Sequence, residues 1–190
     1  MICLKTIVSN SVNEIVIKNS KFITLLIKID SSNINDYLDK IKKDYPKATH
    51  YCYAYIYGDV KHCSDDGEPG STAGMPMLNV LEKEGMMNVL CVVVRYFGGI
   101  KLGAGGLVRA YSKSVKEAID NSNIRELQYG YKVSIEINYD DKKDFEYIIR
   151  NEEIINVDYD LTIKYLLHIK KENLDIINRF PYTVIDEEYY

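Results

Sequence analysis

The sequence predicts an α+β protein of two domains, residues 1–128 and 129–190, and three observations lead to this prediction. Segments that alternate between apolar and polar residues, as strands do, are interleaved with segments that repeat apolar residues at helical spacing. From residue 131 these segments follow the order strand–helix–strand–strand–helix–strand, which is typical of a ferredoxin-like unit. The polar run Asn121-Ser122-Asn123 separates the two patterns, and we place the boundary near residue 128.

The first domain is expected to form one sheet with its helices on one side. Two strands rich in β-branched residues open it, with a turn at Asn19-Ser20. Pro46 ends the first helix, and Pro76 can stand in the first turn of the next, where a proline is tolerated. The expected elements are strands 14–18 and 21–29, helix 33–45, strand 50–57, loop 58–74, helix 76–84, buried strand 88–96, loop 98–106 and helix 107–119.

The second domain is expected to be a four-stranded antiparallel sheet with two helices. Its first helix begins with acidic residues, which the positive end of the helix dipole favours. The expected elements are strand 131–139, helix 141–151, two strands within 157–169, helix 171–180 and strand 182–186.

Composition indicates a folded protein whose charge is uneven. Of the 190 residues, 46% are hydrophobic and 27% are charged, which is typical of a globular chain. The formal net charge of −4 argues mildly against a nucleic-acid binder, which is usually basic. However, residues 131–190 hold 8 basic and 14 acidic side chains, a net charge of −6, so residues 1–130 carry +2. We therefore expect any anionic partner to meet the first domain.

The sequence predicts a cytoplasmic protein with no membrane partner. Residues 1–5 lack the apolar core of a signal peptide, and no apolar run approaches the length that crosses a bilayer. The four cysteines, Cys3, Cys52, Cys63 and Cys91, are therefore expected to be reduced thiols.

Residues 64–76 form the first candidate site, which we call the acidic loop. Asp65, Asp66 and Glu68 lie within four positions and are followed by Thr72 among glycines and prolines. No regular element tolerates that mixture, so the segment is expected to be a shaped loop. One interpretation is a solvated turn with a helix cap. The other is a carboxylate site for a cation or for the lysines of a partner, although the spacing is not that of a calcium-binding hand.

Residues 95–109 form the second candidate site, in which a buried strand runs through glycines into a helix. Such a loop frees backbone N–H groups, and a helix N-terminus adds partial positive charge. Residues 95–116 contain no acid and hold five cations: Arg95, Lys101, Arg109, Lys113 and Lys116. The pattern predicts a seat for a phosphate or carboxylate, although it lacks the closing Gly-Lys-Ser/Thr of a Walker loop. The residues assigned to anion or RNA binding are Arg95, Gly98, Gly99, Lys101, Gly103, Gly105, Gly106 and Arg109. The alternative is a tight turn whose glycines serve close packing.

Histidines and cysteines give no convincing metal or nucleophile pattern. His50, Cys52, His62 and Cys63 lack the spacing of a zinc finger. Adjacent residues tend to point apart, which disfavours Cys63 as a nucleophile activated by His62. We therefore assign no catalytic residue, no metal and no cofactor.

The motif segments together resemble a known family. They are Tyr51–Tyr55, Ser64–Pro69, Thr72–Gly74 with Pro76, Val92–Gly103 and Gly105–Tyr111. These segments, between about 50 and 111, are similar to the signature of the YigZ/IMPACT family, and the flanking elements agree in order with its bacterial members. Two positions depart from the pattern: Ser71 stands where many members have Gly, and Met75 where many have a basic residue. Because Met75 replaces a basic residue, the predicted anion-binding region has one positive charge fewer than in those members.

The resemblance implies a fold and a biological setting. It implies an N-terminal domain like the second domain of ribosomal protein S-five and a C-terminal domain like the last domain of elongation factor G. Eukaryotic members are translational regulators that bind a large ribosome-associated protein. The resemblance therefore implies a non-enzymatic module that contacts RNA, the ribosome or a translation-associated protein, with no DNA sequence specificity.

An enzyme acting on a small phosphorylated or carboxylated substrate is the alternative hypothesis. Asp65, Asp66 and Glu68 would then hold a metal or act as acid and base. If strands 50–57 and 88–96 run parallel, both loops emerge at one edge of the sheet. The three carboxylates are then expected to lie close to Arg95, Lys101 or Arg109, either around a ligand or as ion pairs that brace the loops.

Overall fold

The computed structural model describes residues 3–190 as two compact units; Met1 and Ile2, at the start of the predicted first domain, lie outside the described residues. The first unit ends at Glu126, and the second is Leu127–Tyr190. Both combine helices with an antiparallel sheet, which confirms the predicted α+β class.

The first unit is built on a five-stranded antiparallel sheet whose centre is the strand β6 (Val89–Tyr96). The strand order is β2 (Ser11–Ile17), β3 (Ser20–Lys28), β6, β4 (His50–Tyr57) and β5 (Val60–Ser64). Every residue of β6 up to Arg95 is buried, as its apolar run predicts. A small second sheet, which the sequence analysis missed, pairs β1 (Lys5–Ile7) with β7 (Ile124–Glu126).

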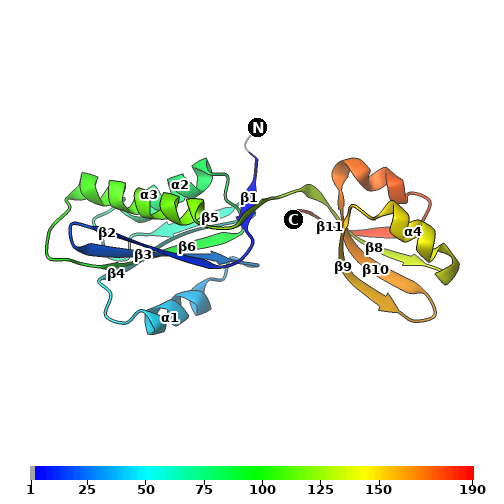
Figure 1. Cartoon of the computed structure of the whole chain (residues 1–190), viewed down its shortest axis with the longest axis horizontal. Helices are drawn as coiled ribbons and strands as arrows, with labels where there is room; N and C mark the ends of the chain where they lie inside the picture. The colour runs from blue at the N-terminus through cyan, green and yellow to red at the C-terminus, as the bar shows by residue number, and fades with distance from the viewer. Residues whose placement is uncertain (1–2) are drawn as a thin grey trace. The chain divides into compact units, whose positions relative to one another are not determined.

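Helices cover both faces of this sheet, so the expectation of helices on one side was wrong. Helices α2 (Gly74–Lys83) and α3 (Ala104–Asp120) lie on one face and α1 (Asn35–Asp44) on the other (Figure 1). The reason lies in β6, whose side chains alternate between the two faces. Cys91 and Val93 join the core under α2 and α3, whereas Leu90, Val92 and Val94 join the core under α1. A central strand that is apolar on both faces needs cover on both.

The segment 58–74 is not one long loop, because its first part forms β5. Strands β4 and β5 pair as a hairpin from Tyr53–Ser64 to Tyr57–Val60, with a turn at Gly58, whose φ is 52°. Strands β4 and β6 pair antiparallel, so the parallel condition considered in the sequence analysis is not met. The hairpin returns the chain to the end of the sheet where β4 begins and β6 ends. The two candidate loops therefore meet at one end of the sheet after all.

The second unit is a four-stranded antiparallel sheet with helices packed on it. The strand order is β11 (Tyr182–Tyr189), β8 (Tyr129–Ile137), β10 (Ile163–Lys170) and β9 (Glu153–Tyr159). The helices are α4 (Lys142–Ile148), which a short 3₁₀ turn η1 (Tyr139–Asp141) precedes, and η2 (Lys171–Ile177). The second expected helix is thus a 3₁₀ helix. The order of elements is the predicted ferredoxin-like one.

Gly98, just after β6, shows why a glycine is needed next to the site. A Cβ built there would lie 2.0 Å from the carbonyl carbon of Asn19, in the turn between β2 and β3. The N–H of Gly98 donates to Oγ of Ser20 at 3.1 Å. The loop that follows β6 is therefore pressed against the β2–β3 turn, and only a residue without a side chain permits that contact.

We expect Gly98→Ala to destabilise the first unit by about 1–3 kcal/mol or more, because the new methyl group must displace backbone atoms. Gly70→Ala is the matched control, since a Cβ at Gly70 meets nothing within 4 Å. Calorimetric melting of both variants measures the difference. Equal melting temperatures would show that the turn moves aside without loss of stability.

Candidate functional site: a pocket at the end of the central strand

A pocket of about 350 Å³ lies where β6 ends. Four segments form it: the start of β4, the acidic loop, the loop after β6 and the first turn of α3. The residues that line it are Thr49, His50, Glu68, Pro69, Arg95, Phe97, Lys101, Leu102, Gly103, Ala104 and Leu107. Both sequence-predicted loops thus contribute to one concave site.

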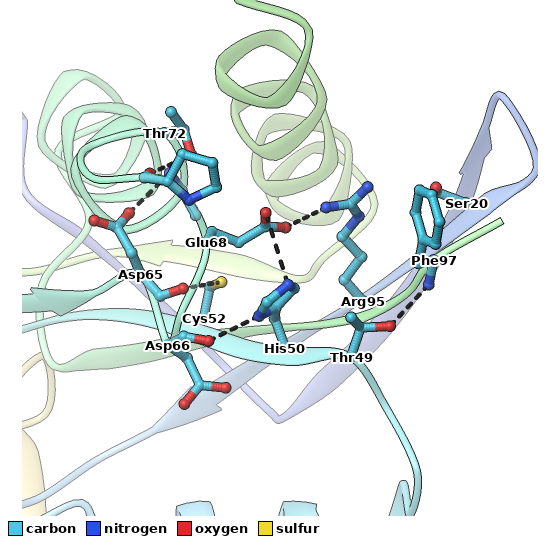
Figure 2. Close-up of polar contacts among 12 residues, drawn as sticks. Ser20, Thr49, His50, Cys52, Asp65, Asp66, Glu68, Thr72, Arg95 and Phe97 are labelled. Carbon is cyan, nitrogen blue, oxygen red and sulfur yellow. Dashed lines mark hydrogen bonds and ion pairs between the residues drawn. The ribbon is translucent and has the colours of Figure 1, made fainter. Parts of the chain in front are cut away.

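A buried ion pair between Glu68 and Arg95 forms one wall of the pocket (Figure 2). Their side chains are 3% and 6% exposed. Oε1 of Glu68 accepts hydrogen bonds from Arg95 and, at 2.8 Å, from the hydroxyl of Tyr111 on α3. The Arg95 guanidinium also lies over the ring of Phe22, 5.4 Å from its centroid. The pair therefore ties the acidic loop to the central strand and, through Tyr111, to α3.

His50 completes this cluster from the start of β4. Its Nδ1 donates to the carbonyl oxygen of Asp66 at 2.8 Å, since a carbonyl can only accept. Its Nε2 lies 3.8 Å from Oε2 of Glu68. The imidazole is thus held between the acidic loop and the ion pair (Figure 2).

Burial keeps the nearby thiol and phenol protonated. Burial raises the pKa of Cys52 to about 12, although a hydrogen bond with Tyr111 opposes this. Its Sγ donates to the carbonyl oxygen of Asp65 at 3.0 Å. Burial, with smaller contributions from Cys52 and Glu68, also raises the pKa of Tyr111. Cys52 is therefore a structural donor and not a nucleophile at neutral pH.

Asp65, Asp66 and Thr72 shape the acidic loop from within. Asp65 accepts three backbone hydrogen bonds of 2.8–2.9 Å, from Ser71, Ala73 and Gly74, and so covers the start of α2. Asp66 accepts the N–H of Tyr51 at 2.6 Å. The hydroxyl of Thr72 donates to the carbonyl oxygen of Pro69 at 2.6 Å. Of the three acids, only Glu68 contacts one of the expected cations.

The second loop leads into the first turn of α3, whose earliest backbone N–H groups have no helical partner. Gly99 and Gly103 have φ values of 84° and 72°, which favour glycine. Gly105 and Gly106 lie within the first turn of the helix, which begins three residues earlier than expected. No side chain caps this end, and the first recorded helical hydrogen bond joins the N–H of Leu107 to Gly103. The preceding N–H groups of the turn therefore lack a helical partner.

The five expected cations divide into two groups. Three of them form ion pairs. Arg95 pairs with Glu68 and Lys113 with Glu117, while Lys116 pairs with both Glu84 and Asp120. Within residues 3–190, no ion pair is recorded for Lys101, which lines the pocket, or for Arg109, one turn further along α3. Those two charges are therefore not neutralised by a recorded ion pair in the described part of the chain.

Several pocket residues were not predicted from the sequence. Thr49 lies just before the first motif, whereas Pro69, Phe97 and Leu102 lie within motifs but received no role, and only their position beside glycine or charged residues points to them. Tyr111 lies on the buried side of α3, and its hydroxyl also donates to Glu68, a role that the sequence analysis did not assign to it. Across residues 3–190, no three His, Cys, Asp or Glu side chains are arranged to hold a metal ion. No helix in that range has the length and apolar character needed to span a membrane.

Comparison with known proteins places this pocket inside a recognised domain. The family model described as the Impact N-terminal domain matches residues 18–119, which is more than half of the chain. The chain belongs to the IMPACT family. The resemblance stated from the sequence is therefore confirmed, and every pocket residue of this IMPACT-family chain falls within the matched range.

Similar proteins include bacterial members of the IMPACT family and a solved structure. The IMPACT family member YvyE of Bacillus subtilis is 48% identical over 118 residues, which cover 60% of this chain and 54% of that protein. The member YigZ of Escherichia coli is 43% identical over 109 residues, or 54% of this chain and 53% of that protein. These matches span about half the length of each relative. A crystal structure of a hypothetical protein aligns with 99% of this chain and 100% of its own, at 28% identity and a TM-score of 0.68.

We expect Glu68→Gln to lower the free energy of unfolding of the first unit by about 3–5 kcal/mol, because it leaves the Arg95 charge buried and unpaired. Glu82→Gln is the matched control. It breaks the exposed Lys61–Glu82 pair and is expected to cost less than about 1 kcal/mol. The double variant Glu68→Leu with Arg95→Met is expected to be more stable than Arg95→Met alone. Denaturant unfolding measures all four, and equal losses for Glu68→Gln and Glu82→Gln would contradict the structural role of the pair.

The Asp65 carboxylate is expected to stabilise the protein only above about pH 4. Burial works to raise the pKa of Asp65, but hydrogen bonds from Gly74, Ser71 and Ala73 together lower it below its ordinary value. A pKa lowered by folding contributes stability above the unfolded pKa of about 3.9, and this stability is lost as the pH falls from there through the folded pKa. The melting difference between wild type and Asp65→Asn should therefore shrink below about pH 4. Asp59→Asn, in the exposed β4–β5 turn, is the control for loss of a surface carboxylate.

Proposed function

We propose that this chain is a non-enzymatic binding module of the translation apparatus and that it contacts RNA at the sheet end that holds the pocket. The observation that carries the proposal is a group of basic side chains there without a recorded ion pair in the described part of the chain. They are Lys18, Lys47, Lys101 and Arg109, all exposed. They come from four segments that meet at this end, and RNA phosphates are the ligands that such a group of cations attracts.

The geometry around β6 explains why these charges gather. Lys18 lies in the β2–β3 turn, against which Gly98 is pressed. Lys47 follows Pro46, whose carbonyl oxygen accepts the hydroxyl of Tyr96 at 3.2 Å. Each loop is therefore fastened to the last residues of the central strand or to the loop that follows it. A rigid sheet end that displays separate cations suits the phosphates of an RNA backbone.

Membership of the IMPACT family supports translation as the setting, because eukaryotic members of this family are translational regulators. Contact with the ribosome or with a translation-associated protein would place the chain in the cytoplasm, which is also proposed here.

One observation favours the alternative, an enzyme for a small phosphorylated or carboxylated substrate. Glu68 and Gly103 line the same pocket, as expected if an enzyme used the carboxylate of Glu68 beside a loop that seats the anionic substrate. The internal bonds of the site weigh against it. Oε1 of Glu68 already accepts bonds from Arg95 and Tyr111, Asp65 accepts three backbone N–H groups, and Cys52 stays protonated. We therefore favour binding over catalysis.

Replacing Lys101 and Arg109 together by Ala is expected to weaken RNA binding and to flatten its salt dependence. Each lost phosphate contact should reduce the slope of log affinity against log salt by about 1. The control variant, Lys83→Ala with Lys113→Ala, removes the same charge from α2 and from later in α3. Fluorescence anisotropy across a salt series and co-sedimentation with ribosomes measure the effect. The proposal fails if wild type neither sediments with ribosomes nor binds RNA at low salt, or if both double variants behave alike.

A further inference from the structure

Phe97 presents an exposed aromatic ring at the pocket, and the structure holds it in place. Its side chain is 46% exposed although it directly follows the buried strand β6. Its N–H donates to Oγ1 of Thr49 at 3.0 Å, and the Arg95 guanidinium lies 5.7 Å from its ring centroid (Figure 2). An aromatic ring that is both exposed and fixed is a surface on which a planar group can stack.

The remaining walls of the pocket divide into an apolar part and a cationic part. Pro69, Leu102 and Leu107 line it with apolar groups. Lys101 and the uncapped first turn of α3, at Ala104, supply positive charge. Independently, Arg95 is 5% exposed and lines the same pocket, and its Nε is buried with no partner in the described part of the chain. The pocket thus combines a stacking surface with donors that suit an anion.

We propose that the pocket receives one unpaired nucleotide of an RNA strand, with the base against Phe97 and the phosphate at Lys101 and the start of α3. This inference rests on the RNA-binding function proposed above and specifies which RNA is bound. The volume of about 350 Å³ lies at the lower end of the range for small-ligand pockets, which suits a single nucleotide. A base-paired strand is not expected to enter the pocket, because its bases are stacked on each other and cannot offer a face to the ring of Phe97.

An exposed aromatic ring beside a cationic part of the pocket favours a nucleotide over an acidic peptide segment. A carboxylate side chain would use the cationic part of the pocket but would leave the ring of Phe97 without a stacking partner. Every nucleobase has a flat face for that ring and is joined to a phosphate. The pocket is therefore expected to be tolerant of base identity and selective for strands that are not paired.

Binding of the full chain to a labelled single-stranded RNA decamer and to the duplex of the same sequence, measured by fluorescence anisotropy, tests the inference. Wild type is expected to prefer the single strand. Phe97→Leu, which keeps apolar bulk but removes the ring, should weaken single-strand binding about 5- to 150-fold and leave duplex binding unchanged. Phe97→Tyr should bind as wild type does. Ile100→Ala is the control, because Ile100 is equally exposed in the same loop but does not line the pocket.

The outcomes distinguish failure of RNA binding from failure of the nucleotide pocket. If neither RNA binds at low salt, the proposed function fails and the inference fails with it. If both RNAs bind equally and Phe97→Leu changes nothing, RNA binding stands and the nucleotide pocket is overturned. If a glutamate-rich peptide displaces the RNA from wild type and binds Phe97→Leu equally well, the pocket serves an acidic protein segment instead. Melting curves of the Phe97 variants separate a loss of binding from a loss of folding.

Discussion

The buried ion pair between Glu68 and Arg95 is the interaction on which the rest of the site depends. Neither charge is solvated, so each is tolerable only because the other is there. Their contact fixes the acidic loop against the end of the central strand, and Tyr111 extends the same contact to α3. A single cluster of polar groups therefore joins the walls of the pocket, while bonds within each loop, such as those of Asp65 and Thr72, set the shape of the loop itself.

This arrangement separates the charges that build the site from the charges that remain for a ligand. Arg95 and Glu68 neutralise each other, while Asp65 and Asp66 bond to backbone N–H groups of the loop and of β4. The conspicuous acidic motif is thus mainly architectural. The exposed groups around the pocket include Lys101, Arg109, the ring of Phe97 and the uncapped start of α3, and Asp66 is exposed beside them. A weakly charged surface of this kind is consistent with the modest net charge of the first domain.

The α+β class and most elements could be predicted from the sequence, because apolar periodicity is a local property that survives folding. Strand β5 escaped because Val60–Ser64 is short, mostly polar and at the sheet edge. The sequence analysis made the meeting of the two loops conditional on parallel strands, whereas the unpredicted β4–β5 hairpin brings them together in an antiparallel sheet. A helix cap was one interpretation of the acidic loop, but the sequence could not show that Asp65 makes it, because its partners are backbone groups that only the folded loop brings together.

The place of β6 in the sheet order also governs when the first unit can form during synthesis. Strands β3 and β4 do not pair with each other, because β6 lies between them and bonds to both. A ribosome that has made the chain only as far as the acidic loop has therefore produced two hairpins with no strand to join them. The sheet closes after Tyr96 has emerged, and the cluster around Glu68 is completed only with Tyr111. Until then the apolar residues that pack against β6 have no strand to cover them, which is the kind of exposed surface that makes partly folded chains prone to aggregation.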